Sequence, residues 1–132
     1  MVGILIITHN SIGEVMLETA ESMMGKTLNR VKTIGIPGNL SPDMLGSYAD
    51  QIRATIEQLD KGHGVLIMTD MIGATPNNLA QYFSAEKHVK IISGLNLPML
   101  MRVINYSDQP LELLAKIGIV GANKGITKEI DI

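Results

Sequence analysis

The sequence predicts an α/β fold, in which a parallel sheet is covered by helices on both faces. Apolar runs rich in β-branched residues recur along the chain, and amphipathic helical patterns separate one run from the next. The chain has 132 residues, of which 45% are hydrophobic, and this suits one core of ordinary size. We therefore expect residues 1–132 to form a single domain.

Four strands are expected from the apolar runs. Residues 2–7 and 65–68 are almost continuously apolar, which is typical of strands buried on both faces of a parallel sheet. Residues 31–36 and 89–92 also carry lysine or threonine, as expected of strands nearer the edges. The first and third strands should therefore be central.

Five helices are expected around these strands. The first should have an apolar face made of Ile12, Val15, Met16, Thr19 and Met23. Residues 41–43 (Ser-Pro-Asp) supply an N-cap, a first-turn proline and a first-turn acid for the second helix, and residues 75–76 (Thr-Pro) repeat the signal for the third. We expect Pro98 and Pro110 to open the last two helices.

The alternation of strands and helices predicts a doubly wound sheet built from right-handed crossovers. The flavodoxin-like strand order 2-1-3-4 suits a chain of this length. In that order the first and third strands are neighbours. Ligands of such sheets bind outside the carboxyl ends of the strands, at the point where the strand order reverses.

The C-terminal tail shows a different pattern. Ile126, Ile130 and Ile132 alternate with Thr127, Glu129 and Asp131, and the pattern is broken only by Lys128 on the apolar side. This period of two predicts a short terminal strand at a sheet edge, where it could also exchange with a second subunit. We therefore expect a homodimer with a swapped terminal strand.

Composition indicates which kinds of binding partner and which cellular compartment suit the protein. The formal net charge is −2 and the lysines and arginines are scattered, which argues against binding to nucleic acid or to an anionic membrane surface. The sequence contains no cysteine, so thiolate chemistry is excluded and a reducing compartment fits. The apolar N-terminal run is too short to span a bilayer and lacks the flanks of a signal peptide. We expect a cytoplasmic protein that does not itself span the membrane.

Two chemically suggestive side chains follow the first and third strands. His9 ends the first strand and Asp70 follows the third, and neighbouring strands lie about 4.8 Å apart, so the pair should come within hydrogen-bonding reach. An imidazole has a pKa of about 6.5, and its neutral form can attack phosphorus through one ring nitrogen. The aspartate would fix the tautomer and stabilise the positive charge that develops on the ring.

Donors for phosphoryl oxygens are available at the same edge. The first helix begins after Ser11, and the third begins near Gly73 and Thr75, so free backbone N–H groups should face the switch point. Gly73 would allow close backbone approach, and the Thr75 hydroxyl could donate a hydrogen bond. The predicted chemistry requires neither a metal ion nor a cofactor.

Each of these residues also has an ordinary structural explanation. A histidine at an arbitrary position is more often solvated or structural, and we interpret His63 and His88 as exposed residues before strands. Asp70 could cap a loop, and Thr75 could cap a helix. The convergence of His9, Asp70 and two helix starts on one switch point favours the functional interpretation.

These residues resemble a known family. The Thr-His that ends the first strand, residues 70–76 (Asp-Met-Ile-Gly-Ala-Thr-Pro) and residues 93–99 (Ser-Gly-Leu-Asn-Leu-Pro-Met) are similar to motifs of the IIA domains of the mannose family of the bacterial sugar phosphotransferase system. The resemblance covers essentially the whole chain. It implies a phosphohistidine at His9, an assisting carboxylate at Asp70, a hydroxyl ligand at Thr75, and a dimer whose terminal strands swap.

The same resemblance implies partners and exposes two departures. The donor would be a phosphorylated histidine carrier protein (HPr), and the acceptor a IIB-type protein or a regulatory target. The family usually has glycine where Asn10 and Ala74 stand, and we include both with Gly73 and Thr75 among the predicted phosphate-binding residues. A loop that requires positive φ at Ala74 would be strained. Arg102 either reaches the phosphate or lies on a solvated helix face.

Three alternatives to a phosphocarrier differ in what they require of the sequence. A regulatory module that signals through its phosphorylation state fits the same site. A receiver-like domain phosphorylated on Asp70 would need an acidic magnesium site after the first strand, and residues 8–10 (Thr-His-Asn) offer none. A dinucleotide site would need a G-x-G-x-x-G motif there, which is absent. The sequence therefore favours a phosphocarrier.

Overall fold

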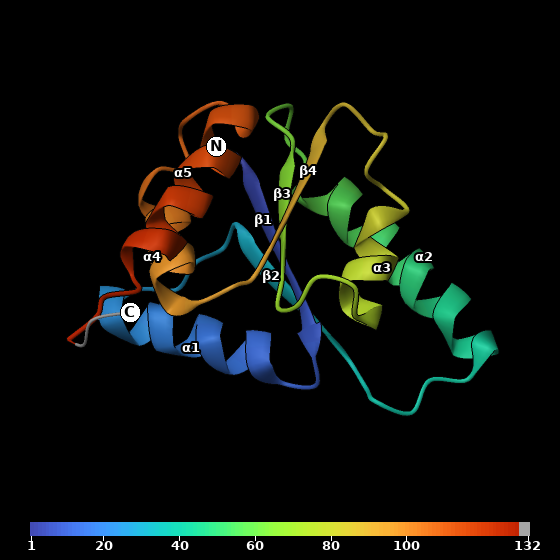
Figure 1. The fold of residues 1–132 in the computed structure, drawn as a ribbon. Coiled ribbons are helices and arrows are strands. Elements are labelled where there is room, and N and C mark those ends of the chain that lie inside the picture. Colours follow the sequence, from blue (N-terminus) through green and yellow to red (C-terminus); the bar gives the residue numbers. More distant parts are fainter. Residues whose placement is uncertain (130–132) are drawn as a thin grey trace.

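Four parallel strands form the central sheet of the computed structural model, which describes residues 1–129 (Figure 1). They are β1 (Gly3–His9), β2 (Val31–Ile36), β3 (Val65–Thr69) and β4 (Val89–Ser93), in the order β2-β1-β3-β4. All three strand pairs are parallel. The predicted order 2-1-3-4 is confirmed, with β1 and β3 as the central pair.

The helices begin close to their predicted signals. They are α1 (Ile12–Met24), α2 (Pro42–Leu59), α3 (Thr75–Gln81), α4 (Leu97–Asn105) and α5 (Leu111–Lys124). Prolines occupy the first turns of α2 and α3, where a missing N–H costs no helical hydrogen bond. Helix α4 starts one residue before Pro98, because the Asn96 side chain caps it by accepting a hydrogen bond from Met99 N–H at 2.8 Å.

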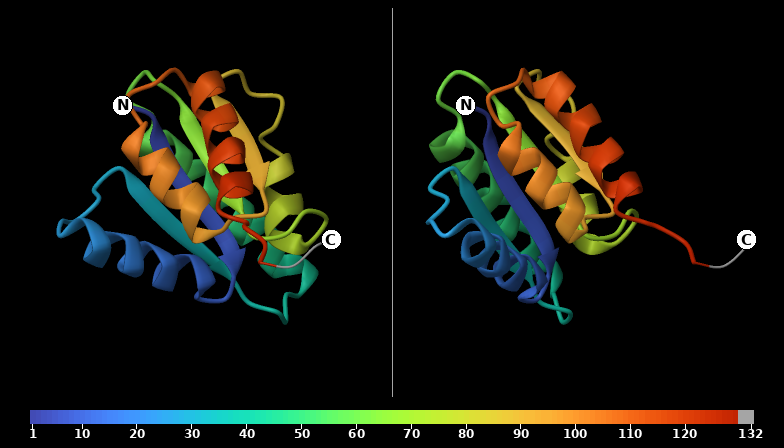
Figure 2. Two further views of the ribbon diagram at one scale, coloured as in Figure 1. Left: turned by 60° about the vertical axis from the view of Figure 1, so that its left-hand side comes forward. Right: turned by 90° about the vertical axis from the view of Figure 1, so that its left-hand side faces the viewer.

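Helices cover both faces of the sheet (Figures 1 and 2). Helices α2 and α3 lie on one face, while α1, α4 and α5 lie on the other. Alternate residues of β1 supply both layers, since Leu5 and Ile7 belong to the α2/α3 core and Ile4 and Ile6 to the opposite core. This double coverage explains the continuously apolar runs of β1 and β3.

The predicted apolar face of α1 is mostly exposed, and of its five residues only Met16 is half-buried against the core. Ile12, Val15 and Met23 are 47%, 55% and 61% exposed, whereas Gly13 and Ala20 are buried. A Cβ at Gly13 would lie 2.7 Å from Ile6 Cγ2, so the helix approaches β1 too closely for large side chains. Most of this apolar stripe is therefore turned toward solvent, and its first residue, Ile12, lies close to the carboxyl end of β1.

The predicted terminal strand is not formed in the part of the tail that the structure describes. Residues 126–129 contain no strand, and Ile130 and Ile132 lie outside the described residues. Figure 2 shows the chain leaving the body of the molecule after α5. Strand exchange between two chains stays a prediction.

None of the helices in residues 1–129 combines the length and the apolar character needed to cross a membrane.

Candidate functional site

The candidate site lies at the carboxyl ends of the two central strands (Figure 1). His9 is the last residue of β1, and Asp70 directly follows β3. The register pairs Ile7 with Thr69, so the two side chains emerge from neighbouring strands at the same edge. This is the switch point of the sheet, at which the strand order reverses.

The structure brings His9 and Asp70 into direct contact. Asp70 Oδ2 lies 2.7 Å from His9 Nδ1 and also accepts a hydrogen bond from the His9 backbone N–H at 2.9 Å. An ionised carboxylate can only accept hydrogen bonds, so we assign the ring proton to Nδ1. The lone pair then lies on Nε2, and the His9 side chain is 37% exposed, compared with 14% for Asp70.

The electrostatics keep Asp70 charged. Burial would raise the pKa of its carboxyl, but hydrogen bonds from the His9 backbone N–H and ring outweigh burial and hold the pKa below its usual range. The other oxygen, Oδ1, is buried and has no hydrogen-bond partner within residues 1–129. An ionised Asp70 orients the ring and would stabilise an imidazolium.

Asn10 adopts a left-handed backbone conformation directly after His9. Its φ is 48°, and its N–H donates to the Ile36 carbonyl at 2.9 Å. A Cβ at Gly35 would overlap the Asn10 carbonyl oxygen, so that glycine is needed for the turn to fit. Asparagine is among the non-glycine residues that best tolerate this region, which explains how it can stand at a position where glycine is usual in the resembling family.

The loop after Asp70 carries the other predicted residues. Gly73 has a φ of 82°, which favours glycine, whereas Ala74 has an extended backbone with φ −87° and ψ 167°. The strain considered for Ala74 therefore does not arise. Thr75 is exposed at the start of α3, and within the described part of the chain the N–H groups of Gly73 and Thr75 have no acceptor. No hydrogen bond among the described residues joins this loop to the His9 ring.

The remaining candidates lie elsewhere. His63 and His88 are both exposed, as predicted, and His88 Nε2 is 4.0 Å from Asp60 Oδ2. The stem of Arg102 lies against α5, where a Cβ at Gly121 would be 2.7 Å from Arg102 Cβ. Neither histidine nor Arg102 contacts the His9–Asp70 pair among the described residues.

Sequence reasoning missed the apolar surface around the pair. Met71 and Ile72, in the loop after Asp70, are 62% and 78% exposed. A groove of about 490 Å³ runs along α1 and is lined by Ser11, Ile12, Val15, Met16, Thr19 and Leu97. Two features of the sequence could have indicated this surface. One is the apolar pair Met71-Ile72 in a loop, and the other is an apolar stripe on a helix whose small residues, Gly13 and Ala20, could pack against the sheet in its place.

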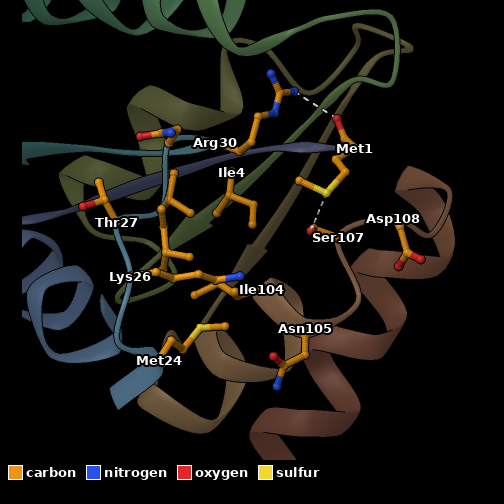
Figure 3. A pocket seen from close by; sticks show the side chains of 13 residues that line it. Met1, Ile4, Met24, Lys26, Thr27, Arg30, Ile104, Asn105, Ser107 and Asp108 are labelled. Atoms are coloured by element: carbon orange, nitrogen blue, oxygen red, sulfur yellow. Dashed lines mark hydrogen bonds between the residues drawn. The ribbon is translucent and has the colours of Figure 1, made fainter. Parts of the chain in front are cut away.

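A second cavity lies at the opposite end of the sheet. Its volume is about 510 Å³, and Figure 3 shows Met1, Ile4, Lys26 and Ile104 among the side chains that line it. It opens near the amino ends of β1 and β2, and neither His9 nor Asp70 lines it. The His9–Asp70 pair therefore lies outside this cavity. Within residues 1–129 no group of three metal-ligating side chains is arranged to hold a metal ion.

Comparison with known proteins relates the chain to components of the phosphotransferase system. The EIIA-man family model, described as "PTS system fructose IIA component", matches residues 3–117. The chain is 32% identical over 108 residues to the PTS system mannose-specific EIIAB component of Escherichia coli K12, covering 81% of this chain and 32% of that protein. It is 24% identical over 109 residues to the PTS system fructose-specific EIIA component of Bacillus subtilis, covering 82% and 72% respectively. The chain thus spans about a third of the EIIAB relatives that it matches.

Solved structures share the fold. The PTS IIA protein associated with the fucose utilization operon of Streptococcus pneumoniae superimposes with a TM-score of 0.81 at 29% identity, covering 96% of this chain and 91% of that one. The mannose/sorbose-specific IIA subunit of Enterococcus faecalis gives a TM-score of 0.82 at 19% identity, covering 99% and 96%, which speaks to fold alone.

Proposed function

Because this chain belongs to the EIIA-man family of phosphotransferase system IIA components, we propose that it is a phosphocarrier that accepts a phosphoryl group on His9 and passes it on. The observation that carries the proposal is the His9–Asp70 pair, with its Nδ1 to Oδ2 distance of 2.7 Å. A carboxylate on Nδ1 leaves Nε2 with its lone pair, and this nitrogen is the nucleophile of the proposed reaction.

The proposed transfer has two steps, in which His9 first receives the phosphoryl group and then gives it to an acceptor. In the first, Nε2 forms a bond to phosphorus while the donor's P–N bond breaks, and that electron pair returns to the donor imidazole. The positive charge that develops on the His9 ring is stabilised by Asp70 through the Nδ1 proton. In the second step, an acceptor nucleophile attacks phosphorus and the P–Nε2 bond breaks, which returns the electron pair to His9.

The loop after Asp70 is proposed to hold the phosphoryl oxygens. Phosphoryl transfer depends mainly on positioning and on fixed donors around the developing charge. The N–H groups of Gly73 and Thr75 lack acceptors in the described part of the chain, and the Thr75 hydroxyl is exposed beside them. Asn10 and Ala74 line the same edge and would shape the space around the phosphate.

The apolar surface around His9 supports protein partners. Ile12, Val15, Met71 and Ile72 are large exposed side chains that lie near the pair, on α1 and on the loop after β3. Exposed apolar surface of this kind is typical of protein interfaces. We propose that a phosphorylated histidine carrier protein donates here and that a IIB-type protein accepts. The cysteine-free sequence fits the cytoplasm, where we place this exchange.

We also propose that the chain acts as a homodimer through its tail. Strand β4 is an edge of the sheet, and Ile126 is 73% exposed where the chain leaves α5. Helix α5 adds Leu113, Ile119 and Val120, each about half exposed. A tail strand from a second copy would pair the free backbone groups of β4 and cover apolar surface.

A labelling experiment tests the proposed function. The chain is incubated with labelled phosphoenolpyruvate, enzyme I and the histidine carrier protein, next to His9→Ala and the matched control His88→Ala. We expect label on the native chain and on His88→Ala, and none on His9→Ala. Equal labelling of His9→Ala would sink the assignment. Label that discharges onto no IIB-type protein would favour the regulatory alternative.

A further inference from the structure

Two buried threonines directly precede the paired side chains. Thr8 lies before His9 in β1, and Thr69 is the last residue of β3, before Asp70. Both are 0% exposed, at a depth where a hydroxyl needs a hydrogen-bond partner. Because the register pairs Ile7 with Thr69, these two hydroxyls lie at the carboxyl ends of neighbouring strands.

Each threonine hydroxyl accepts a hydrogen bond from the first turn of the next helix. The Gly13 N–H of α1 donates to Thr8 Oγ1 at 2.8 Å, and Asn77 Nδ2 of α3 donates to Thr69 Oγ1 at 2.9 Å. Helices α1 and α3 lie on opposite faces of the sheet. The two bonds therefore fix one helix start on each face, next to His9 on one side and next to Asp70 on the other.

Thr69 also connects a third segment. Its carbonyl oxygen accepts a hydrogen bond from the Leu95 N–H at 3.0 Å, in the loop before α4. Asn77 is only 4% exposed, so its bond to Thr69 is shielded from water, where a lost partner is costly. The end of β3, the start of α3 and the loop before α4 thus meet at one buried residue.

The loop between Asp70 and α3 depends on this connection. Met71, Ile72 and Gly73 are exposed, and the loop's own hydrogen bonds are a long one from the Ala74 N–H to the Met71 carbonyl at 3.4 Å and an exposed one from Asn78 Nδ2 to the Gly73 carbonyl at 3.3 Å. The proposed oxygen-binding N–H groups sit where this loop joins α3. The buried Thr69–Asn77 bond fixes the α3 side of this loop relative to β3, and the His9–Asp70 bonds fix its other end.

We infer that Thr8, Thr69 and Asn77 are positioning residues, which hold the His9 ring and the oxygen-binding loop in register for phosphoryl transfer. The inference rests on the proposed function and deepens it. None of the three side chains needs to touch the phosphoryl group. A displacement of about 1 Å at a reacting centre can lower a rate about 100-fold, so loss of one of these bonds should act on the chemical step.

Single-turnover transfer from the phosphorylated histidine carrier protein tests this. Thr69→Val keeps the shape and removes the acceptor. Thr8→Val removes the acceptor on the other face and also the bond that the Thr8 hydroxyl donates to the His9 carbonyl at 3.2 Å. We expect each to lower the maximal rate by about 10- to 100-fold, with less than about a twofold change in the half-saturating carrier concentration. Thr69→Ser should restore the rate to within about threefold, because the hydroxyl returns. The matched control Thr55→Val, which loses an exposed hydroxyl bond to Gln51 in α2, should transfer at the native rate.

The rates are read at a temperature at which circular dichroism shows every variant to be folded. If Thr69→Val does not fold, Asn77→Ala replaces it, since this change removes the donor and keeps the Thr69 hydroxyl. Variants with a lower melting temperature but the native maximal rate would overturn the inference. Thr8, Thr69 and Asn77 would then have a purely structural role. His9→Ala separates the two hypotheses. If it still accepts phosphate, the proposed function fails; if it does not, and Thr69→Val transfers normally, only the positioning role fails.

Discussion

At the residue scale, the ionised state of Asp70 governs what His9 can do. A protonated Asp70 would no longer attract the Nδ1 proton as strongly, and the ring could then adopt either tautomer. The bonds from His9 oppose protonation, because they lower the pKa of Asp70 against the effect of burial. The pair is therefore stable as a unit at neutral pH and is lost in acid.

The lowered pKa of Asp70 predicts a pH dependence of stability. Its contribution is fully present above the unfolded-state pKa of about 3.9 and is lost as pH falls through the lower folded-state pKa. Urea unfolding from pH 6 to pH 3 should therefore show a smaller fall in unfolding free energy for Asp70→Asn than for the native chain. The pKa of Asp60 is also lowered, chiefly by the hydrogen bond from the Gly62 N–H. Asp60 is present in both proteins, so its contribution cancels when the two curves are compared. Parallel curves for the two proteins would contradict the pairing.

Topology alone allowed the His9–Asp70 contact to be predicted, but backbone conformations at the site could not be. The pairing follows from two strand ends and the order 2-1-3-4. The φ of 48° at Asn10 arises because Gly35 on β2 admits the Asn10 carbonyl, a contact between residues far apart in sequence. Likewise Ala74 has an extended backbone, which the residue type alone does not specify.

The left-handed conformation of Gly73 predicts that replacement by alanine destabilises the protein at Gly73 but not at Gly38. Gly73 and Gly38 both have open space where a Cβ would be, but only Gly73 has positive φ. Gly73→Ala should lower the unfolding free energy by about 1–2 kcal/mol through backbone strain alone. Gly38→Ala should leave it unchanged or raise it by up to about 1 kcal/mol. Equal effects in urea unfolding would show that the loop conformation is wrong.

At the element scale, the packing of α1 follows backbone proximity more than hydrophobic periodicity. The apolar stripe was identified correctly as a pattern, yet the residues that face β1 are small ones, Gly13 and Ala20. Periodicity identifies an apolar face but does not show how closely a helix can approach its sheet. The exposed residues nearest His9, Ile12 and Val15, belong to the surface that we propose for protein partners.

Close packing of α1 predicts that replacing two helical glycines with alanine changes the unfolding free energy in opposite directions. A Cβ at Gly13 would lie 2.7 Å from Ile6 Cγ2 and 3.2 Å from Thr8 Oγ1, whereas Gly46 in α2 has nothing within 4 Å. Gly13→Ala should cost about 1–3 kcal/mol of unfolding free energy through overpacking. Gly46→Ala should gain about 0.5–1 kcal/mol, because alanine is the better helix former. A gain at both positions would place α1 farther from the sheet than described.

At the scale of the whole molecule, the sheet has two open edges, β2 and β4, and the described part of the tail pairs with neither of them. The order of the four strands was predictable from apolar runs and crossover handedness. Residues 126–129 form no strand, because a strand needs a neighbouring strand with free backbone groups and this segment leaves the body of its own chain. In the proposed dimer, a second copy would supply the strand that this pattern requires.

The tail pattern makes the dimer testable with single substitutions. Light scattering at micromolar concentration should give twice the mass of one 14.3 kDa chain for the native protein and the mass of a monomer for a chain ending at residue 125. Ile126→Asp places a charge on the apolar side of the pattern and should also give a monomer, whereas Thr127→Asp, on the polar side, should stay dimeric. A native monomer would reject the dimer. A truncated chain that remains dimeric would instead move the interface to the exposed apolar residues of α5, since the tail would then contribute nothing that holds two copies together.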